Sequence, residues 1–149
     1  MRYLALIAWF ITALGGLYML AVWLIENDAT DQRSSSSRLP LAVIVAHMTL
    51  AVSGLVVWVA YLLLDRPALA WAAVAILAGI AVLGLAMFAR WIPVYRMASD
   101  GSGQSQEARP VRELPAEGSF PLLVVLAHGT FAVSTVVLVL LTALGVGGS

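Results

Sequence analysis

Four long apolar stretches without a formally charged side chain dominate the chain, at residues 3–25, 39–64, 67–89 and 120–144. Each is longer than the roughly 20 residues that a helix needs to cross about 30 Å of hydrocarbon. Helices satisfy every backbone polar group within one segment, and four separate stretches are too few for a closed barrel. The pattern therefore predicts an all-α membrane protein, a bundle of four transmembrane helices.

Short polar segments separate these stretches and determine how they connect. Asp65-Arg66-Pro67 is brief enough for a tight turn, and its proline suits the first turn of a helix. The second and third helices are therefore expected to be antiparallel neighbours. Residues 26–38 and 91–119 then lie at the opposite end, and the Gly- and Ser-rich part of the second segment predicts flexible chain. Three aromatic residues near that end are expected to anchor in the membrane interface: Trp23, Trp91 and Tyr95.

The second and fourth stretches are related in sequence, and so are the first and third. PLAVIVAHMTLAVS at 40–53 and PLLVVLAHGTFAVS at 121–134 share nine of fourteen residues. GLYMLAVW at 16–23 and GLAMFARW at 84–91 share five of eight. This identity exceeds what shared hydrophobicity would give. It indicates a tandem duplication of a two-helix unit.

The duplication leads to an expected symmetry. Residues 1–64 form the first repeat and residues 67–149 the second, within a single domain that covers 1–149. Two spans separate the copies, so both copies run through the membrane in the same direction. Parallel repeats of this kind are related by an axis along the membrane normal. We therefore expect a bundle with a pseudo-twofold axis.

Composition narrows the class of protein and the possible cofactors. The chain is 62% hydrophobic and 11% charged, with a formal net charge of zero. The bilayer is therefore its expected solvent, and nucleic acid is not an expected partner. The absence of cysteine excludes disulfides, thiolate metal sites and covalent CxxCH attachment of haem. No hydrolase or transferase motif is present, and the use of arginine for every basic side chain favours a bacterial cell membrane.

The two histidines of the chain, His47 and His128, occupy the same position in the two repeats. Each lies eight residues inside its stretch, which is about 12 Å at 1.5 Å per residue. An ionisable side chain at this depth usually faces the bundle interior and is a functional candidate. A twofold axis would let both imidazoles approach one object from opposite sides. We therefore predict that they ligate the iron of one b-type haem between the second and fourth helices.

Small residues follow each histidine at helical spacing. Ala51 and Gly54 do so in the first repeat, and Ala132 and Thr135 in the second. They leave room for a flat macrocycle, and they also permit close helix packing. Haem propionates need cations near the same end of the bundle, and Arg90 is the best placed, although it equally suits snorkelling at a helix end. The predicted cofactor contacts are Ala51, Gly54, Ala132 and Arg90.

Two alternatives to haem remain open. Each imidazole could simply join helices in a scaffold subunit without a cofactor. Met19 and Met87 are repeat-equivalent and lie near the depth of the histidines, so two imidazoles and two thioethers could bind copper, or a methionine could replace one imidazole on haem iron. In the scaffold case, each histidine would bond the carbonyl one turn earlier or the histidine of the other repeat. In the haem case, the second ring nitrogen would donate to the carbonyl one turn earlier, near Val43 or Val124.

The pairing of His47 and His128 on two helices of a four-helix membrane bundle resembles the architecture of integral-membrane b-type cytochromes of the cytochrome b561 kind. The resemblance involves all four spans and is carried by these two residues, whereas such cytochromes commonly use more histidines and two haems. It implies one-electron exchange with a quinol or a partner protein. A homo-oligomer and a place in a larger complex both remain open.

Overall fold

A computed structural model of the chain describes residues 1–31, 39–101 and 116–146. It contains four long helices, α1 (Arg2–Asp31), α2 (Leu41–Leu64), α3 (Pro67–Gly101) and α4 (Leu122–Ala143), and a short 3-10 helix, η1 (Ala116–Ser119). All four long helices are sufficiently long and apolar to cross a membrane. The predicted all-α class with four membrane-spanning helices is confirmed.

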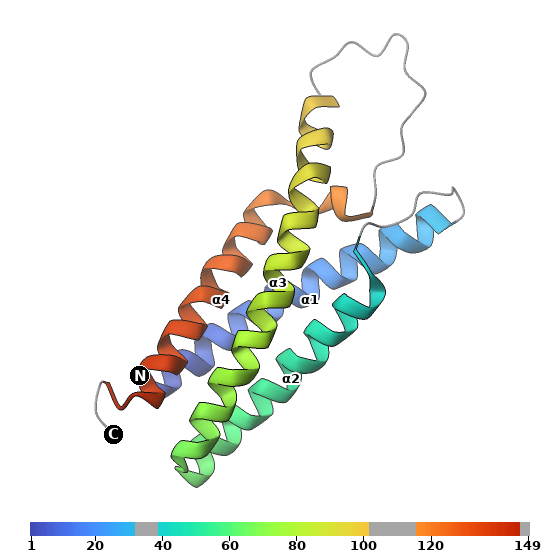
Figure 1. The fold of residues 1–149 in the computed structure, drawn as a ribbon. Helices are drawn as coiled ribbons and strands as arrows, with labels where there is room; N and C mark the ends of the chain where they lie inside the picture. Colours follow the sequence, from blue (N-terminus) through green and yellow to red (C-terminus); the bar gives the residue numbers. More distant parts are fainter. Residues whose placement is uncertain (32–38, 102–115, 147–149) are drawn as a thin grey trace.

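The helices form an antiparallel bundle in which α1 packs mainly on α4, and α2 mainly on α3 (Figure 1). The α3–α4 and α1–α2 contacts are smaller, and within the described residues α1 does not pack on α3, nor α2 on α4. These last two pairs therefore lie on the diagonals of the bundle. The start of α1 and the end of α4 lie at the same end as the α2–α3 turn. We call this the turn end, and the opposite end, which carries η1, the loop end.

Conformational signals in the sequence explain how the helices begin and end. Asp65 adopts a left-handed conformation (φ 51°) and its N–H donates to the carbonyl of Tyr61, which closes α2. Pro67 then begins α3, as the predicted tight turn requires. Pro40 and Pro121 hold nearly identical extended conformations before α2 and α4, with φ −64° in both and ψ 127° and 125°. The two histidine helices thus start in the same way.

Two helices are longer than the apolar pattern predicted. α1 continues past residue 25 to Asp31, and α3 continues past residue 89, through Pro93, to Gly101. The extension of α3 is stabilised by packing, because Trp91 and Val94 are buried. Part of the segment predicted as a loop is therefore helical, and α1 and α3 project beyond the bundle at the loop end (Figure 1). The flexible stretch was predicted at residues 99–104, but residues 99–101 form the end of α3, and residues 102–104 lie outside the described residues.

The buried core consists of two clusters. The larger fills the turn-end half and is centred on Trp9, Trp58 and Tyr61. The smaller lies at the loop end and contains Trp23, Leu39, Ile44 and Ala116. Large apolar side chains cover the outside of the bundle, as expected where lipid replaces water. Examples from each helix are Leu4, Ile7, Val52, Leu63, Val82, Leu85, Leu123 and Val133.

Candidate functional site

His47 and His128 lie at matching positions on α2 and α4. Each is the sixth residue after the first residue of its helix, so both lie about 9 Å from the loop-end start of the helix. Both side chains are half-buried. Because α2 and α4 are diagonal in the bundle, the two imidazoles approach from opposite sides of its axis.

Each imidazole lies against a glycine of the helix beside it. A Cβ atom placed on Gly16 of α1 would be 3.2 Å from Cε1 of His128, and one on Gly84 of α3 would be 3.4 Å from Cε1 of His47. Gly16 and Gly84 are also equivalent in the predicted repeat. Glycine lets each ring approach the neighbouring helix backbone closely, which a larger residue would prevent.

The Nδ1 atoms of the two rings differ in their bonding. Nδ1 of His128 lies 2.9 Å from the carbonyl oxygen of Thr12 on α1. Nδ1 of His47 is buried and interacts with the backbone of Ile80 on α3 without reaching hydrogen-bond geometry. Thr12 and Ile80 are separated by the same 68 positions as Gly16 and Gly84. Each ring thus faces the equivalent backbone position of its neighbour helix.

The prediction that these nitrogens bond the carbonyl one turn earlier, near Val43 or Val124, was wrong. His128 bonds across the interface to Thr12, and His47 has no hydrogen bond at Nδ1. The physical reason is that a glycine on the adjacent helix lets each imidazole pack closely against the backbone of that helix. The glycine-containing helix alongside then brings its carbonyls within reach of the ring.

The small residues predicted beside the histidines have different neighbours. Ala51 and Ala132 are half-buried, close to the bundle interior. Gly54 is buried against other side chains, since a Cβ there would be 2.9 Å from the indole of Trp9 and 3.0 Å from Ile76. A macrocycle could therefore contact Gly54 only if Trp9 moved. Contacts between a cofactor and these residues stay predictions.

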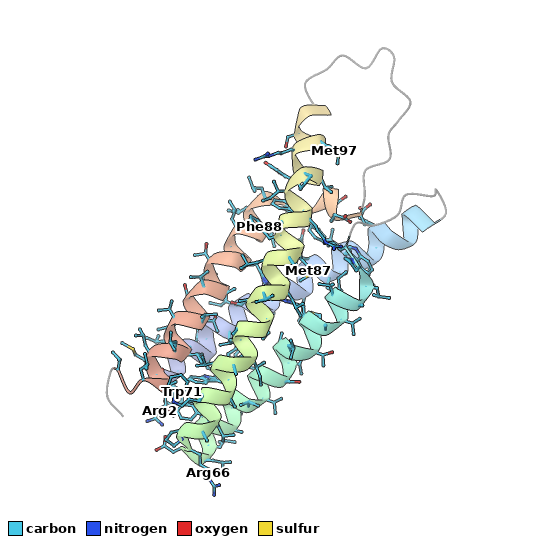
Figure 2. The ribbon with its side chains drawn as sticks, viewed as in Figure 1. Arg2, Arg66, Trp71, Met87, Phe88 and Met97 are labelled. Atoms are coloured by element: carbon cyan, nitrogen blue, oxygen red, sulfur yellow. The ribbon has the colours of Figure 1, made fainter. Side chains whose placement is uncertain are left out.

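The side chains predicted nearer the loop end lie on α1 and α3. Arg90 is exposed on α3, six residues beyond Gly84, which is about 9 Å closer to the loop end. Met87, labelled in Figure 2, packs against the loop-end cluster, and Met19 is half-buried on α1. The predicted roles of Arg90, Met19 and Met87 in binding a cofactor stay predictions.

The tryptophans expected at the membrane interface are instead packed inside the loop end. Trp23 is 6% exposed and Trp91 is 4% exposed. Nε1 of Trp91 donates to the backbone carbonyl of Glu117 at 3.1 Å, and its ring contacts those of Phe88 and Tyr95. The indole of Trp91 thus joins η1 to α3, and that of Trp23 on α1 belongs to the same cluster as Ala116 of η1.

Sequence reasoning missed two buried polar residues. Glu117 in η1 is fully buried at the loop end, and only its position in a short segment after Pro115 hinted at structure there. Thr135 is 1% exposed, and its hydroxyl lies 3.4 Å from that of Thr12. Thr135 was considered only as a small residue, although its place seven residues after His128 puts it on the same helix face.

The described residues offer two imidazoles but no larger metal-binding group. No cluster of three or more His, Cys, Asp or Glu side chains that could hold a metal ion occurs among them. The number of available ligands decides which kind of metal site is possible. A free metal ion usually needs three or four protein ligands, whereas haem iron takes its equatorial nitrogens from the porphyrin and needs at most two axial ligands.

Comparisons with protein-family models, curated proteins and solved structures found no match. The function is therefore inferred from the residues of this chain.

Proposed function

We propose that His47 and His128 are the axial ligands of one b-type haem and that the protein exchanges electrons with a quinol or a partner protein. The observation that carries the proposal is the contact between Nδ1 of His128 and the Thr12 carbonyl at 2.9 Å. In a neutral ring this bond places the proton on Nδ1 and leaves the Nε2 lone pair for a metal. Metal-binding histidines typically hold their second nitrogen in this way.

The placement of His47 supports the same role. Its ring matches that of His128 in depth, in its glycine neighbour and in the backbone position that it faces. Its Nδ1 atom is buried without a hydrogen bond to the described residues, which is costly in a membrane interior. A small shift of the ring toward Ile80 would complete the bond and leave Nε2 available to a metal.

The surrounding residues suit a flat group with polar edges. Gly16 and Gly84 hold the rings close to the helix backbones, and Arg90 lies on the loop-end side, where it would pair with propionates. When bound, the haem supplies one-electron chemistry, and the chain supplies axial ligation and a low-dielectric surrounding.

The pattern of helix contacts supports the proposed duplication. A twofold operation that exchanges α1 with α3, and α2 with α4, converts the α1–α4 pair into the α3–α2 pair, and these are the two most extensive interfaces. The glycine and carbonyl positions beside the histidines follow the same exchange. We propose that the axis runs along the normal of a bacterial cell membrane.

A cofactor-free scaffold is the second candidate, and one observation favours it. The contact between His128 and Thr12 links α4 to α1 without any ligand, as polar side chains commonly do in membrane bundles. A copper site that also uses Met19 and Met87 stays a prediction. Met87 packs in the loop-end cluster with Trp23 and Ile44.

An absorption spectrum of the purified protein, expressed with ample haem and solubilised gently, separates these candidates. The haem proposal predicts a Soret band and the sharp visible bands of low-spin iron after reduction. If the protein is colourless but binds Cu(I) and is stabilised by it, the copper site replaces the haem proposal. A colourless protein that is indifferent to copper would leave the scaffold role.

A further inference from the structure

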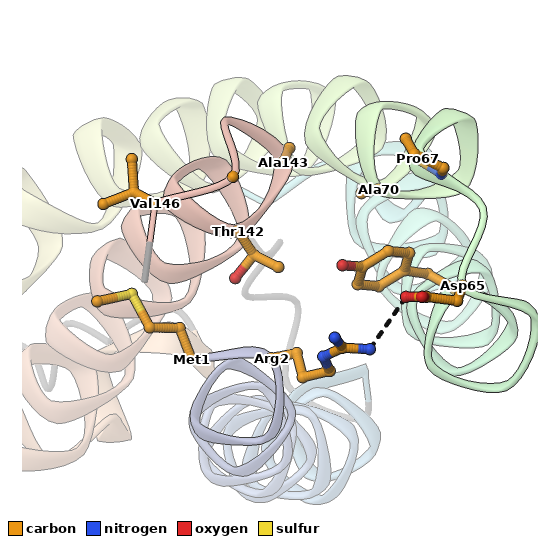
Figure 3. Close-up of a pocket in the computed structure, with 10 residues that line it drawn as sticks. Met1, Arg2, Asp65, Pro67, Ala70, Thr142, Ala143 and Val146 are labelled. Carbon is orange, nitrogen blue, oxygen red and sulfur yellow. Dashed lines mark hydrogen bonds and ion pairs between the residues drawn. The ribbon is translucent and has the colours of Figure 1, made fainter. Parts of the chain in front are cut away.

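A pocket of ≈ 250 Å³ opens at the turn end, far from the histidines (Figure 3). It lies where the start of α1, the α2–α3 turn and the end of α4 meet, and Arg2, Tyr61, Asp65 and Thr142 provide its polar side chains. These elements are the ends of membrane spans. The pocket is therefore at the level of lipid headgroups.

The Arg2 guanidinium and the Asp65 carboxylate form an ion pair at this pocket, which Met1 also lines. Nη1 of Arg2 donates to Oδ1 of Asp65 at 3.0 Å, with the Arg2 side chain 24% exposed and that of Asp65 71% exposed. Figure 3 draws this pair at the side of the pocket opposite Val146. A guanidinium carries five N–H donors, so donors of Arg2 remain for a ligand. The carboxylate likewise keeps acceptor capacity toward solvent.

Tyr61 adds a donor that the protein does not use. The residue is 8% exposed, lines the pocket, and its hydroxyl has no hydrogen bond with another described residue. Thr142 differs, since its hydroxyl donates to the Leu138 carbonyl at 2.7 Å and can only accept from a ligand. The phenol oxygen is not enclosed, since the buried side-chain nitrogen and oxygen atoms without a partner among the described residues are Nδ1 of His47 and Nε1 of Trp58. The hydroxyl can therefore donate to a ligand with acceptor oxygens in the pocket.

We propose that this pocket binds the phosphoethanolamine headgroup of a zwitterionic membrane phospholipid. The phosphate accepts from Arg2 and Tyr61, and the ammonium donates to Asp65. A headgroup with only negative charge would meet the Asp65 carboxylate without compensation, whereas a zwitterion matches both charges. The acyl chains then follow the exposed apolar surface at this end, which includes Leu64 and Leu144. The proposal is independent of any cofactor at the histidines.

The test measures binding of phosphatidylethanolamine, phosphatidylcholine and phosphatidylglycerol with identical acyl chains to delipidated full-length protein by native mass spectrometry. Wild type should bind the ethanolamine lipid tightest, because choline has no N–H to donate to Asp65. Tyr61→Phe should weaken that binding about two- to tenfold, the effect of one hydrogen bond. Tyr18→Phe is the matched control, because Tyr18 is exposed on α1 and does not line the pocket.

Asp65→Asn distinguishes recognition from damage to the fold. Asparagine tolerates the left-handed conformation of position 65, so the turn is retained while the charge is removed. The preference should then move from the ethanolamine lipid to phosphatidylglycerol, since Arg2 loses its counter-charge. Arg66→Gln, outside the pocket at the same end (Figure 2), should change nothing. Equal affinity of wild type for all three lipids, or an unchanged preference in Asp65→Asn, would overturn the proposal.

Discussion

His47 and His128 share a depth, a glycine neighbour and a facing backbone position, but they differ in how firmly each ring is held. Nδ1 of His128 lies 2.9 Å from the Thr12 carbonyl, whereas Nδ1 of His47 has no hydrogen bond. The contact with glycine is also closer on the His128 side, 3.2 Å against 3.4 Å. The two proposed repeats therefore place the ring alike, but the hydrogen bond and the closer packing hold it only in the second repeat. In the proposed haem site, His128 would be the pre-organised ligand, and His47 the one that the cofactor has to position.

The largest effect is expected from removing either ring. His47→Ala and His128→Ala should each abolish the reduced low-spin haem spectrum, because one axial ligand is lost in both. Met19→Ala and Met87→Ala should leave it largely intact. Circular dichroism and gel filtration of each variant establish that the bundle is retained. Loss of the spectrum in a methionine variant, with survival in a histidine variant, would make the methionine an axial ligand instead.

Alanine substitutions at Gly16 and Gly84 should have different effects on the free energy of unfolding. At Gly84 the new Cβ meets His47 at an ordinary contact distance, so Gly84→Ala should be neutral or stabilising by up to about 1 kcal/mol through helix propensity. At Gly16 the contact is tighter and His128 is held in place, so Gly16→Ala should cost about 1–3 kcal/mol. Unfolding of the haem-free protein in mixed micelles measures both. The control is Gly129→Ala, where a Cβ meets nothing within 4 Å. Equal effects at Gly16 and Gly84 would mean that both rings are equally free to move.

A smaller effect isolates the hydrogen bond itself. In the haem-free protein, His128→Ala should destabilise the fold more than His47→Ala by about 0.5–1.5 kcal/mol, since only the former removes a contact to a carbonyl. The cavity cost is similar for the two half-buried rings and largely cancels in the difference. If His47→Ala proves the more costly, His128 is not the better-fixed ring.

The smallest effect is expected at Thr12. Its carbonyl belongs to the main chain, so Thr12→Val should preserve the bond from His128 while removing the hydroxyl contacts to Ala8 and Thr135. We expect a loss below about 1 kcal/mol and an unchanged tautomer of His128. The ¹⁵N chemical shifts of the imidazole report the tautomer. A shift of the proton to Nε2 in this variant would show that the side chain, not the carbonyl, fixes the ring.

Much of the fold followed from the sequence because hydrophobic length dominates in a membrane. Four uncharged stretches gave the four spans, and Asp65-Arg66-Pro67 gave the turn. The helix ends were less predictable. The continuation of α3 through Pro93 depends on burial of Trp91 and Val94 and on the bond from Trp91 to η1, and no local pattern encodes these tertiary contacts.

The candidate site was predictable in position but not in partners. The matched sequences around His47 and His128 gave their common depth. Their partners depended on which helices are neighbours, and the sequence does not say that α4 packs on α1 and α2 on α3. For the same reason Thr12 was missed. The Arg2–Asp65 pair was also missed, because 63 positions separate its members and the packing of α1 beside α2 brings them together.

Titration of purified haem-free protein with haem b tests directly whether His47 and His128 form a haem site. We predict that the Soret band saturates at one haem per chain and that the reduced spectrum is that of low-spin iron with two imidazole ligands. Failure to saturate, or binding that survives in the His47→Ala, His128→Ala double variant, would contradict the claim that these two residues form a haem site.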